Sequence, residues 1–301
     1  MREYRAEECI LRYEEIKDKK RQTGIRITGF SGSGCRLRVP EIIGGMPVRV
    51  IGKKAFLSRK NLTVIELPET VEEIEDWAFA YCGSMERLTI PGGDIRLGRA
   101  ILLDCVSLAR VDGCGPEAWE KAYGYLLAAA VRDLNAEYLL EPRAVGSGEW
   151  LEKWDARLMA IMREDDTEGF SRQILCGEED YGSTDLGAYI SGQRRRKVRL
   201  AMLRLLYGIG LSETGRETLK AYLVNHTRGG ESDETWRVLL EEYGEDAERR
   251  QLFLELGCVT EENIDGLLAD IGDEYPEMTA AFLRYKEEHI GYRDFFDRLS
   301  L

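Results

Sequence analysis

The sequence is poor in the residues that most often carry catalysis or bind metals. It has only two histidines in 301 residues, His226 and His289, and its seven cysteines include no Cys-x-x-Cys pair. Without a clustered Cys/His motif, a zinc site is not expected. No Gly-x-Ser-x-Gly motif supports a serine hydrolase. We therefore expect no catalytic residue, no metal and no cofactor, and we interpret both histidines as structural, His226 at the carboxyl end of a helix.

Long apolar runs and a signal-like N-terminus are also missing. No stretch approaches about 18 uninterrupted apolar residues, so no membrane-spanning helix is expected. Residues 1–22 carry charge every few positions and have no apolar core, unlike a secretory signal. The scattered, odd-numbered cysteines favour reduced thiols over a disulfide framework. These absences predict a cytoplasmic protein, or a secreted or surface protein if an export signal precedes this sequence.

Charge is unevenly distributed along the chain. Residues 1–114 carry 19 Lys and Arg against 17 Asp and Glu, whereas the whole chain carries 42 against 55. The first part is therefore nearly neutral and the remainder strongly acidic, and such a change in composition indicates a domain boundary. The acidic part lacks the concentrated positive field that nucleic acid or anionic lipid requires, so neither is expected as a partner.

Apolar residues repeat every 23 positions in the first third of the chain. The equivalent sets are Ile51/Ile74/Leu97, Ala55/Ala78/Ile101, Phe56/Phe79/Leu102, Leu62/Met85/Leu108 and Ile65/Leu88/Val111. A period of about 20 to 29 residues is typical of leucine-rich repeats. A unit this short must stack on its neighbours to bury its apolar face. We therefore predict a β-rich solenoid, with Phe56 stacked on Phe79 and with Cys82 and Cys105, also 23 apart, in a buried ladder.

Prolines and glycines indicate where the first coil departs from this period. Pro68 and Pro91 are 23 positions apart, but Pro40 and Pro68 are 28 apart, which predicts about five extra residues at positions 44–47. The glycine-rich segment 29–34 resembles a phosphate-binding loop only superficially. A strand rather than a helix is expected after it and no Gly-Lys-Ser/Thr follows, so we predict a β-turn. Residues 1–24 are predicted to form an irregular N-terminal cap.

Three segments, residues 27–56, 62–91 and 97–111, resemble the BspA-like leucine-rich repeat family. The family pattern is matched at Leu62, Ile65, Leu67, Pro68, Val71, Ile74, Ala78, Phe79, Cys82 and Met85. The resemblance covers about residues 25–112, and Ile101-Leu102 in place of Ala-Phe indicates that the array ends there. It implies a solenoid that binds other molecules. Many members of this family are surface or secreted adhesive proteins.

Helical periodicity replaces the strand pattern after Gly115. Pro116 is predicted in the first turn of a helix. Further helices are predicted at about 149–163, 193–207, 213–226, 233–243, 245–256, 261–271 and 275–288. Ser212 and Thr260 are predicted N-caps 48 positions apart, and this offset weakly resembles ankyrin-like or HEAT-like helical repeats. The predicted fold class is α+β: an N-terminal cap (1–24), a leucine-rich repeat domain (25–114) and an acidic α-helical repeat-like domain (115–301).

Two surfaces are candidates for protein binding. Residues between the inward apolar ones of each repeat strand face outward. These are Thr63, Val64, Glu66, Glu86, Arg87, Thr89, Ala109, Arg110 and Asp112. The second surface is the basic run Arg194, Arg195 and Arg196, expected at the start of the 193–207 helix, which either docks an acidic partner or neutralises neighbouring acidic helices. Acidic runs 72–76 and 164–166 lack calcium-loop spacing and are interpreted as solvated faces.

Together these patterns predict a protein–protein interaction or scaffold module that catalyses no reaction, with an unidentified protein partner. The first alternative is an exported surface or host-interaction protein. The second is an enzyme of unrecognised type in the helical half, which a deep pocket with convergent polar groups would indicate.

Overall fold

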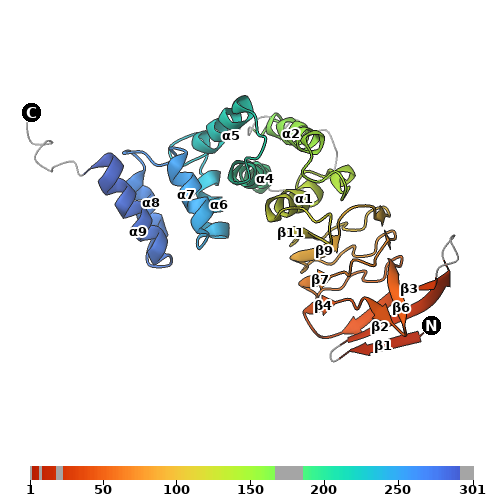
Figure 1. The fold of residues 1–301 in the computed structure, drawn as a ribbon. Helices are drawn as coiled ribbons and strands as arrows, with labels where there is room; N and C mark the ends of the chain where they lie inside the picture. Colours follow the sequence, from red (N-terminus) through yellow and green to blue (C-terminus); the bar gives the residue numbers. More distant parts are fainter. Residues whose placement is uncertain (1, 7–8, 18–22, 167–185, 292–301) are drawn as a thin grey trace, which may run out of the picture. The chain divides into compact units, whose positions relative to one another are not determined.

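The computed structural model describes residues 2–6, 9–17, 23–166 and 186–291. It divides into two compact units, Met1–Leu158 and Met159–Leu301 (Figure 1). The change from strand to helix falls where the sequence predicted it, after Cys114. The first unit nevertheless extends past this change and includes helices that the sequence assigned to the second domain. No helix in the described residues is long and apolar enough to cross a membrane.

The strands of unit 1 form two sheets. They are β1 (Arg2–Ala6), β2 (Cys9–Lys17), β3 (Thr23–Gly32), β4 (Arg36–Arg38), β5 (Ile42–Ile43), β6 (Met46–Ile51), β7 (Val64–Glu66), β8 (Glu73–Ile74), β9 (Arg87–Pro91), β10 (Arg96–Leu97) and β11 (Arg110–Cys114). Sheet A has the order β1-β2-β3-β6-β8-β10, with β5 paired to β6, and sheet B has the order β11-β9-β7-β4. Each coil of the chain contributes one strand to each sheet.

Parallel pairing in register reproduces the 23-residue period. Ile65 pairs with Leu88, and Leu88 with Val111. The core between the sheets contains Phe56 and Phe79, whose stacked rings have centroids 5.2 Å apart. The thiols of Cys82 and Cys105 donate to the carbonyls of Phe56 and Phe79, at Sγ–O distances of 3.0 and 3.3 Å. The predicted aromatic stack and cysteine ladder are confirmed.

The turns that return the chain from sheet A to sheet B also repeat. Each contains two non-glycine residues in the left-handed region, four positions apart. They are Lys54 and Ser58, Trp77 and Tyr81, and Ala100 and Asp104, with φ between 53° and 61°. Backbone N–H groups of one turn donate to carbonyls of the next. These turns are called the turn ladder below.

The N-terminal cap is regular, which corrects the prediction of an irregular one. Strands β1, β2 and β3 pair antiparallel, and β3 then pairs parallel with β6. The cap thus continues sheet A instead of merely covering it. Strand β3 runs through Gly32, so residues 29–32 of the predicted turn are strand and the bend comes at residues 33–35. The extra residues of the first coil form the β5–β6 hairpin, with Gly44 and Gly45 at φ 58° and 79°.

The C-terminal end of the solenoid is closed by helices. Helix α1 (Lys121–Arg132) packs on β11, and η1 (Glu137–Leu139) and α2 (Gly148–Met162) follow. The predicted start at Pro116 is wrong, because α1 begins at Lys121 and residues 116–117 form a turn. A Cβ on Gly124 would lie 2.6 Å from the carbonyl oxygen of Val111. Only glycine therefore permits this close approach of helix and strand.

The described part of unit 2 is built from helices. They are α4 (Leu186–Leu206), α5 (Glu213–Asn225), α6 (Glu234–Tyr243), α7 (Ala247–Glu255), α8 (Ile264–Ile271) and α9 (Pro276–Tyr285), followed by the π-helical turn η2 (Lys286–Ile290). Helix α4 contacts α5, α6 and α7. Ser212 caps α5 as predicted. Helix α8 starts at Ile264, three residues later than expected, because Thr260 exchanges hydrogen bonds with Asn263 in a preceding turn.

Candidate functional site

The outer face of sheet B carries two columns of polar side chains. Strand register aligns Arg36, Val64, Arg87 and Arg110 in one column, and Arg38, Glu66, Thr89 and Asp112 in the other. The residues between them, such as Ile65 and Leu88, are fully buried. The alternation is that of a sheet with one face in the core and one facing outward. The outward set predicted from the sequence is thereby brought together on one surface, with Thr63, Glu86 and Ala109 preceding the three strands.

Charged side chains on this face form a continuous ladder across the four strands. Glu66 accepts from Arg38 at 2.8 Å and from Arg87 at 3.3 Å. Asp112 lies 3.9 Å from Arg87 and 2.8 Å from Arg110. Opposite charges therefore alternate along the direction of stacking. We call Arg38, Glu66, Arg87, Asp112 and Arg110 the charge ladder.

One end of the charge ladder is accessible and the other is partly covered. The side chain of Arg38 is 83% exposed, whereas that of Arg110 is 19% exposed. Arg110 lies over the ring of Tyr125 of α1, 5.5 Å from its centroid. Burial, the largest single influence, lowers the pKa of Arg110, but hydrogen bonds with Tyr125 and Asp112 together outweigh it, so that the pKa is raised. The β4 end is thus the part of this face open to a partner.

The sequence missed Arg38, the most exposed member of the ladder. The 23-residue period does not reach β4, because the extra residues of the first coil shift the register to 28 positions, from Arg38 to Glu66. The spacing of Pro40 and Pro68 carried this signal. Applied to the outward residues, that spacing would have placed Arg38 beside Glu66.

The second candidate surface lies inside a helix rather than at its start. Arg194, Arg195 and Arg196 fall within α4, and each is only partly exposed. Arg195 donates to Glu241 and Glu242 of α6, with N–O distances of 2.7 Å. Arg199 also pairs with Glu242, at 3.2 Å. The sequence left two roles open for this run, neutralising acidic helices or docking an acidic partner. The observed contacts agree with the first role, and docking stays a prediction.

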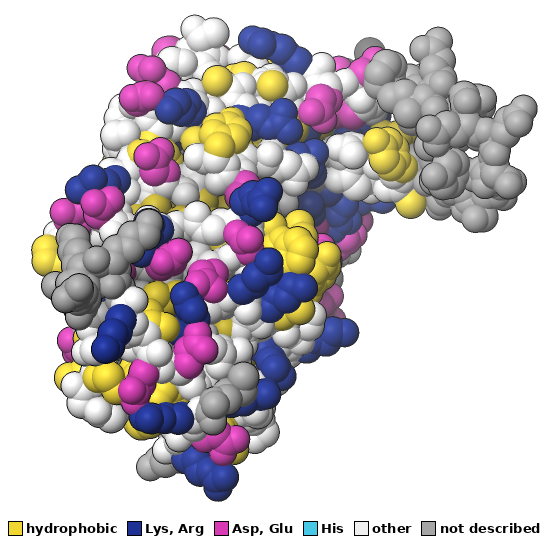
Figure 2. Space-filling model, turned by 90° about the vertical axis from the view of Figure 1, so that its right-hand side faces the viewer, with side chains coloured by type: hydrophobic (Ala, Val, Ile, Leu, Met, Phe, Trp, Pro, Cys, Tyr) yellow, Lys and Arg dark blue, Asp and Glu magenta, His cyan; other side chains and the backbone are white. Residues whose placement is uncertain are grey.

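Some of the acidic residues that were predicted to be solvated form ion pairs with arginines. In segment 72–76, Glu73 pairs with Arg96 at 2.8 Å and Glu75 with Arg26 at 3.0 Å. Figure 2 shows such an alternation of Lys or Arg with Asp or Glu over much of the face turned to the viewer. Asp166 is half-buried in unit 2, so interpreting its run as a solvated face is wrong at this residue.

Asp166 organises a polar cluster in unit 2. It accepts from the ammonium group of Lys197 at 3.0 Å and from the hydroxyl of Tyr222 at 2.8 Å. Burial would raise its pKa, but these two hydrogen bonds outweigh burial and lower it. His226, at the carboxyl end of α5 as predicted, stacks on Tyr222 with centroids 4.0 Å apart. The polar groups of this cluster bond mainly to one another, which is typical of a structural network.

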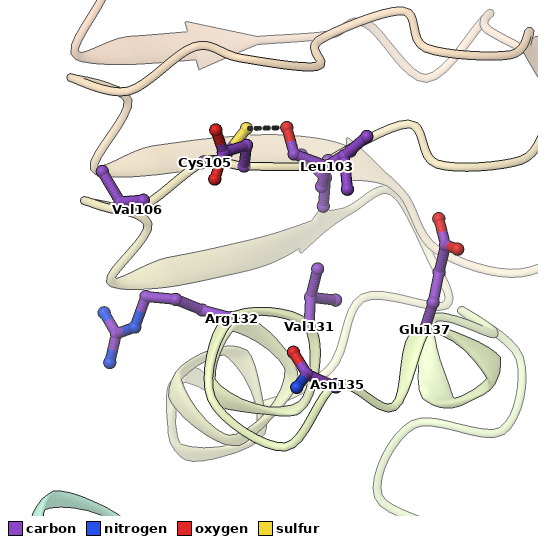
Figure 3. A pocket seen from close by; sticks show the side chains of 9 residues that line it. Leu103, Cys105, Val106, Val131, Arg132, Asn135 and Glu137 are labelled. Carbon is purple, nitrogen blue, oxygen red and sulfur yellow. Dashed lines mark hydrogen bonds between the residues drawn. The ribbon is translucent and has the colours of Figure 1, made fainter. Parts of the chain in front are cut away.

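A hollow of about 340 Å³ lies at the end of the solenoid in unit 1. The last turn of the ladder forms one wall, which includes Leu102, Leu103 and Val106. The opposite wall is formed by Val131 of α1 and by Asn135, which follows α1 (Figure 3). No pattern in the sequence indicated it, because the hollow depends on how far α1 covers the last coil.

Comparison with known protein families identifies the family of the repeat segment. Residues 30–115 match the family model described as BspA type Leucine rich repeat region, in six copies. This segment is a BspA-type leucine-rich repeat region. The family resemblance inferred from the sequence is therefore confirmed for the solenoid. The match ends at residue 115, so the ankyrin-like or HEAT-like resemblance of unit 2 stays a prediction.

Solved structures with similar segments are also leucine-rich repeat proteins. A leucine-rich repeat protein of T. pallidum is 31% identical over 33% of this chain and 46% of its own, with a TM-score of 0.31. A leucine-rich cell surface protein of Faecalibacterium prausnitzii is 27% identical over 36% of this chain and 30% of its own, with a TM-score of 0.30. A leucine-rich repeat protein of Bacteroides ovatus is 23% identical over 36% and 28%, with a TM-score of 0.31. This chain spans less than half of the length of each. No curated protein matches the chain.

Proposed function

We propose that this protein is an interaction module that binds a partner protein through the outer face of sheet B and catalyses no reaction. The observation that carries the proposal is the charge ladder, which runs across the four strands of sheet B and is open at β4. Exposed ion pairs contribute only about 0 to 1 kcal/mol each to stability. The fold therefore does not depend on the pairing of the exposed Arg38 with Glu66.

The arrangement favours a protein partner over nucleic acid. Acidic and basic groups alternate within a few ångströms, as in the pairing of Glu66 with both Arg38 and Arg87. Such a surface presents no continuous positive field for phosphates. It fits a protein surface with the opposite alternation, because charge complementarity sets the register of docking and suppresses wrong partners.

The test is charge reversal at the ladder. A variant with Glu86→Lys, Arg87→Glu and Arg110→Glu is expected to melt at a lower temperature, because Arg87 and Arg110 lose their partly buried partners Glu66 and Asp112, but to stay folded because no side chain of the core changes. The control is Arg96→Glu on sheet A, a side chain that is 70% exposed and pairs with Glu73. Partners captured by the unmodified protein, identified by mass spectrometry, should be lost from the triple variant and kept by the control. Partners retained by the triple variant would reject this face.

We further propose that the protein acts in the cytoplasm. Cys82 and Cys105 are buried in the core as thiols, and both donate to backbone carbonyls. Proteins of oxidising compartments more often pair their cysteines. Fractionation of the source cells with an antibody against the protein tests this location, and recovery from the cell surface or the medium would favour the exported alternative.

A further inference from the structure

The turn ladder of the repeat region has an unfinished end. In the first step, the N–H groups of Lys54, Phe56 and Ser58 donate to the carbonyls of Asp76, Ala78 and Ala80, at 3.2, 2.8 and 2.9 Å. In the second step, the N–H groups of Trp77, Phe79 and Tyr81 donate to the carbonyls of Arg99, Ile101 and Leu103, at 3.0, 3.0 and 2.7 Å. Each turn thus donates from alternate residues to alternate residues of the turn that follows.

The last turn has donors in the same register. The next set is Ala100, Leu102 and Asp104, which lie one repeat period after Trp77, Phe79 and Tyr81. No group in the described part of the chain accepts from these three N–H groups. Leu102 is almost fully buried. Ala100 is partly exposed and Asp104 is exposed, so this row of donors is open to water or to an acceptor supplied from outside the described part of the chain.

The space that a following turn would occupy is the hollow described above. Val131 on α1 faces the last turn across it, and Val106 and Glu137 lie toward its two ends (Figure 3). Its volume of about 340 Å³ is within the range of ligand pockets, about 300 to 1,000 Å³. Helix α1 covers β11 but does not supply carbonyls to the last turn.

The wall of the hollow that the last turn forms is apolar. Leu103 and Val106 are 46% and 62% exposed, whereas Ala80, which precedes Leu103 by one repeat period, is fully buried by the next coil. The last coil therefore leaves both hydrogen-bond donors and apolar surface uncovered at one place. Water satisfies N–H donors but does not compensate exposed leucine and valine side chains.

We propose that this edge binds a segment of a partner polypeptide that adopts the same turn conformation and continues the turn ladder by one step. Three N–H donors at alternate residues match the acceptors of such a turn, because within the ladder the accepting carbonyls of Asp76, Ala78 and Ala80 also come from alternate residues of a turn. The segment supplies three carbonyls to Ala100, Leu102 and Asp104, and an apolar side chain that contacts Leu103 and Val106. This site is separate from the charge ladder, so the failure of either proposal leaves the other standing.

Hydrogen exchange followed by NMR tests the proposal on the full chain. In the free protein, the amides of Ala100, Leu102 and Asp104 are expected to exchange at least tenfold faster than those of Trp77, Phe79 and Tyr81. Equal protection of the two sets in dilute free protein would overturn the proposal. If protection of the first set instead rises with protein concentration, the occupant is a second copy, and the assignment to a partner segment is wrong.

A synthetic peptide supplies the occupant in a defined form. The probe is the capped hexapeptide with the sequence of Asp76–Tyr81, whose carbonyls serve as acceptors in the intact ladder. Saturating peptide is expected to slow exchange of the three amides at least tenfold, whereas a scrambled peptide has no such effect. The absence of protection would reject the edge as a binding site.

Matched variants separate binding at the hollow from general effects. Val106→Glu places a charge on the apolar wall formed by the last turn and is expected to weaken peptide binding at least tenfold. Ile42→Glu changes a similarly exposed side chain on the β5–β6 hairpin and is expected to leave binding unchanged. Leu103→Glu provides a second variant, and protected amides at Trp77 and Phe79 show that each variant is folded. Equal binding by Val106→Glu and Ile42→Glu would contradict the proposed site.

Discussion

The stacked phenylalanines provide the sharpest test of the solenoid core. Phe79 is fully buried, and its ring stacks on that of Phe56 with an interplanar angle of 11°. Replacing Phe79 by Ala removes a ring that neighbouring coils hold on both sides and leaves a cavity. Such substitutions cost about 3 to 5 kcal/mol in total.

The expected change in melting temperature follows from the size of unit 1. For a domain of about 150 to 250 residues, each kcal/mol shifts the melting temperature by about 2 to 4 °C. A loss of about 3 to 5 kcal/mol thus lowers the melting temperature of unit 1 by roughly 6 to 20 °C. Differential scanning calorimetry measures the shift, and hydrogen exchange at Leu88 assigns the transition to the repeat region.

The control is an aromatic side chain in the same coil that lies at the surface. Tyr81 is 48% exposed and its backbone is in the left-handed region. Alanine also carries a Cβ, so the substitution leaves the backbone strain at this position unchanged. Tyr81→Ala is therefore expected to change stability by no more than about 0.5 kcal/mol. If Phe79→Ala melts within a degree or two of this control, the assignment of inward and outward positions from the 23-residue period is wrong.

Three further predictions concern other parts of the molecule. Burial raises the pKa of Cys105 to about 12, so iodoacetamide at pH 8 should modify exposed Cys35 and leave Cys105 intact by mass spectrometry. Gly124→Ala should destabilise unit 1 by about 1 to 3 kcal/mol in thermal melts, although alanine favours helices, because the new Cβ would meet the carbonyl of Val111. The pKa of Asp166 is lowered from its unfolded value of 3.8, so its contribution to stability is complete at neutral pH and is lost as the pH falls below that value. Urea titrations should show Asp166→Asn less stable than the unmodified protein at pH 7. The difference should shrink in acid.

Local sequence periodicity predicted much of the fold because local contacts determine it. The repeat positions follow from a period that each coil satisfies with its immediate neighbours, so Ile65, Leu88 and Val111 align without reference to the rest of the chain. Helix α5, predicted at 213–226 and observed at Glu213–Asn225, is defined by its Ser212 cap and its own apolar spacing. Such elements need only nearby residues to be recognised.

Elements that depend on distant packing were the ones missed. Cap strands β1 and β2 have high charge and weak alternation, and they form strands because β3 and β6 already supply a sheet edge. Arg195 was placed at a helix start, whereas α4 begins at Leu186. Its charge is compensated by Glu241 and Glu242, which lie far along the chain on α6. Neither arrangement is encoded within one local window of sequence.

Two edges of unit 1, strand β1 and the last turn of the ladder, differ in chemistry, and this difference bears on function. Edge strand β1 carries Arg2, Glu3 and Arg5, and charges at an edge strand discourage pairing with other chains. The last turn of the ladder instead presents three N–H donors beside exposed Leu103 and Val106. A protein selected only for stability and solubility would protect both edges alike. Protection of one edge and exposure of the other therefore favours the last turn as a place where another polypeptide binds.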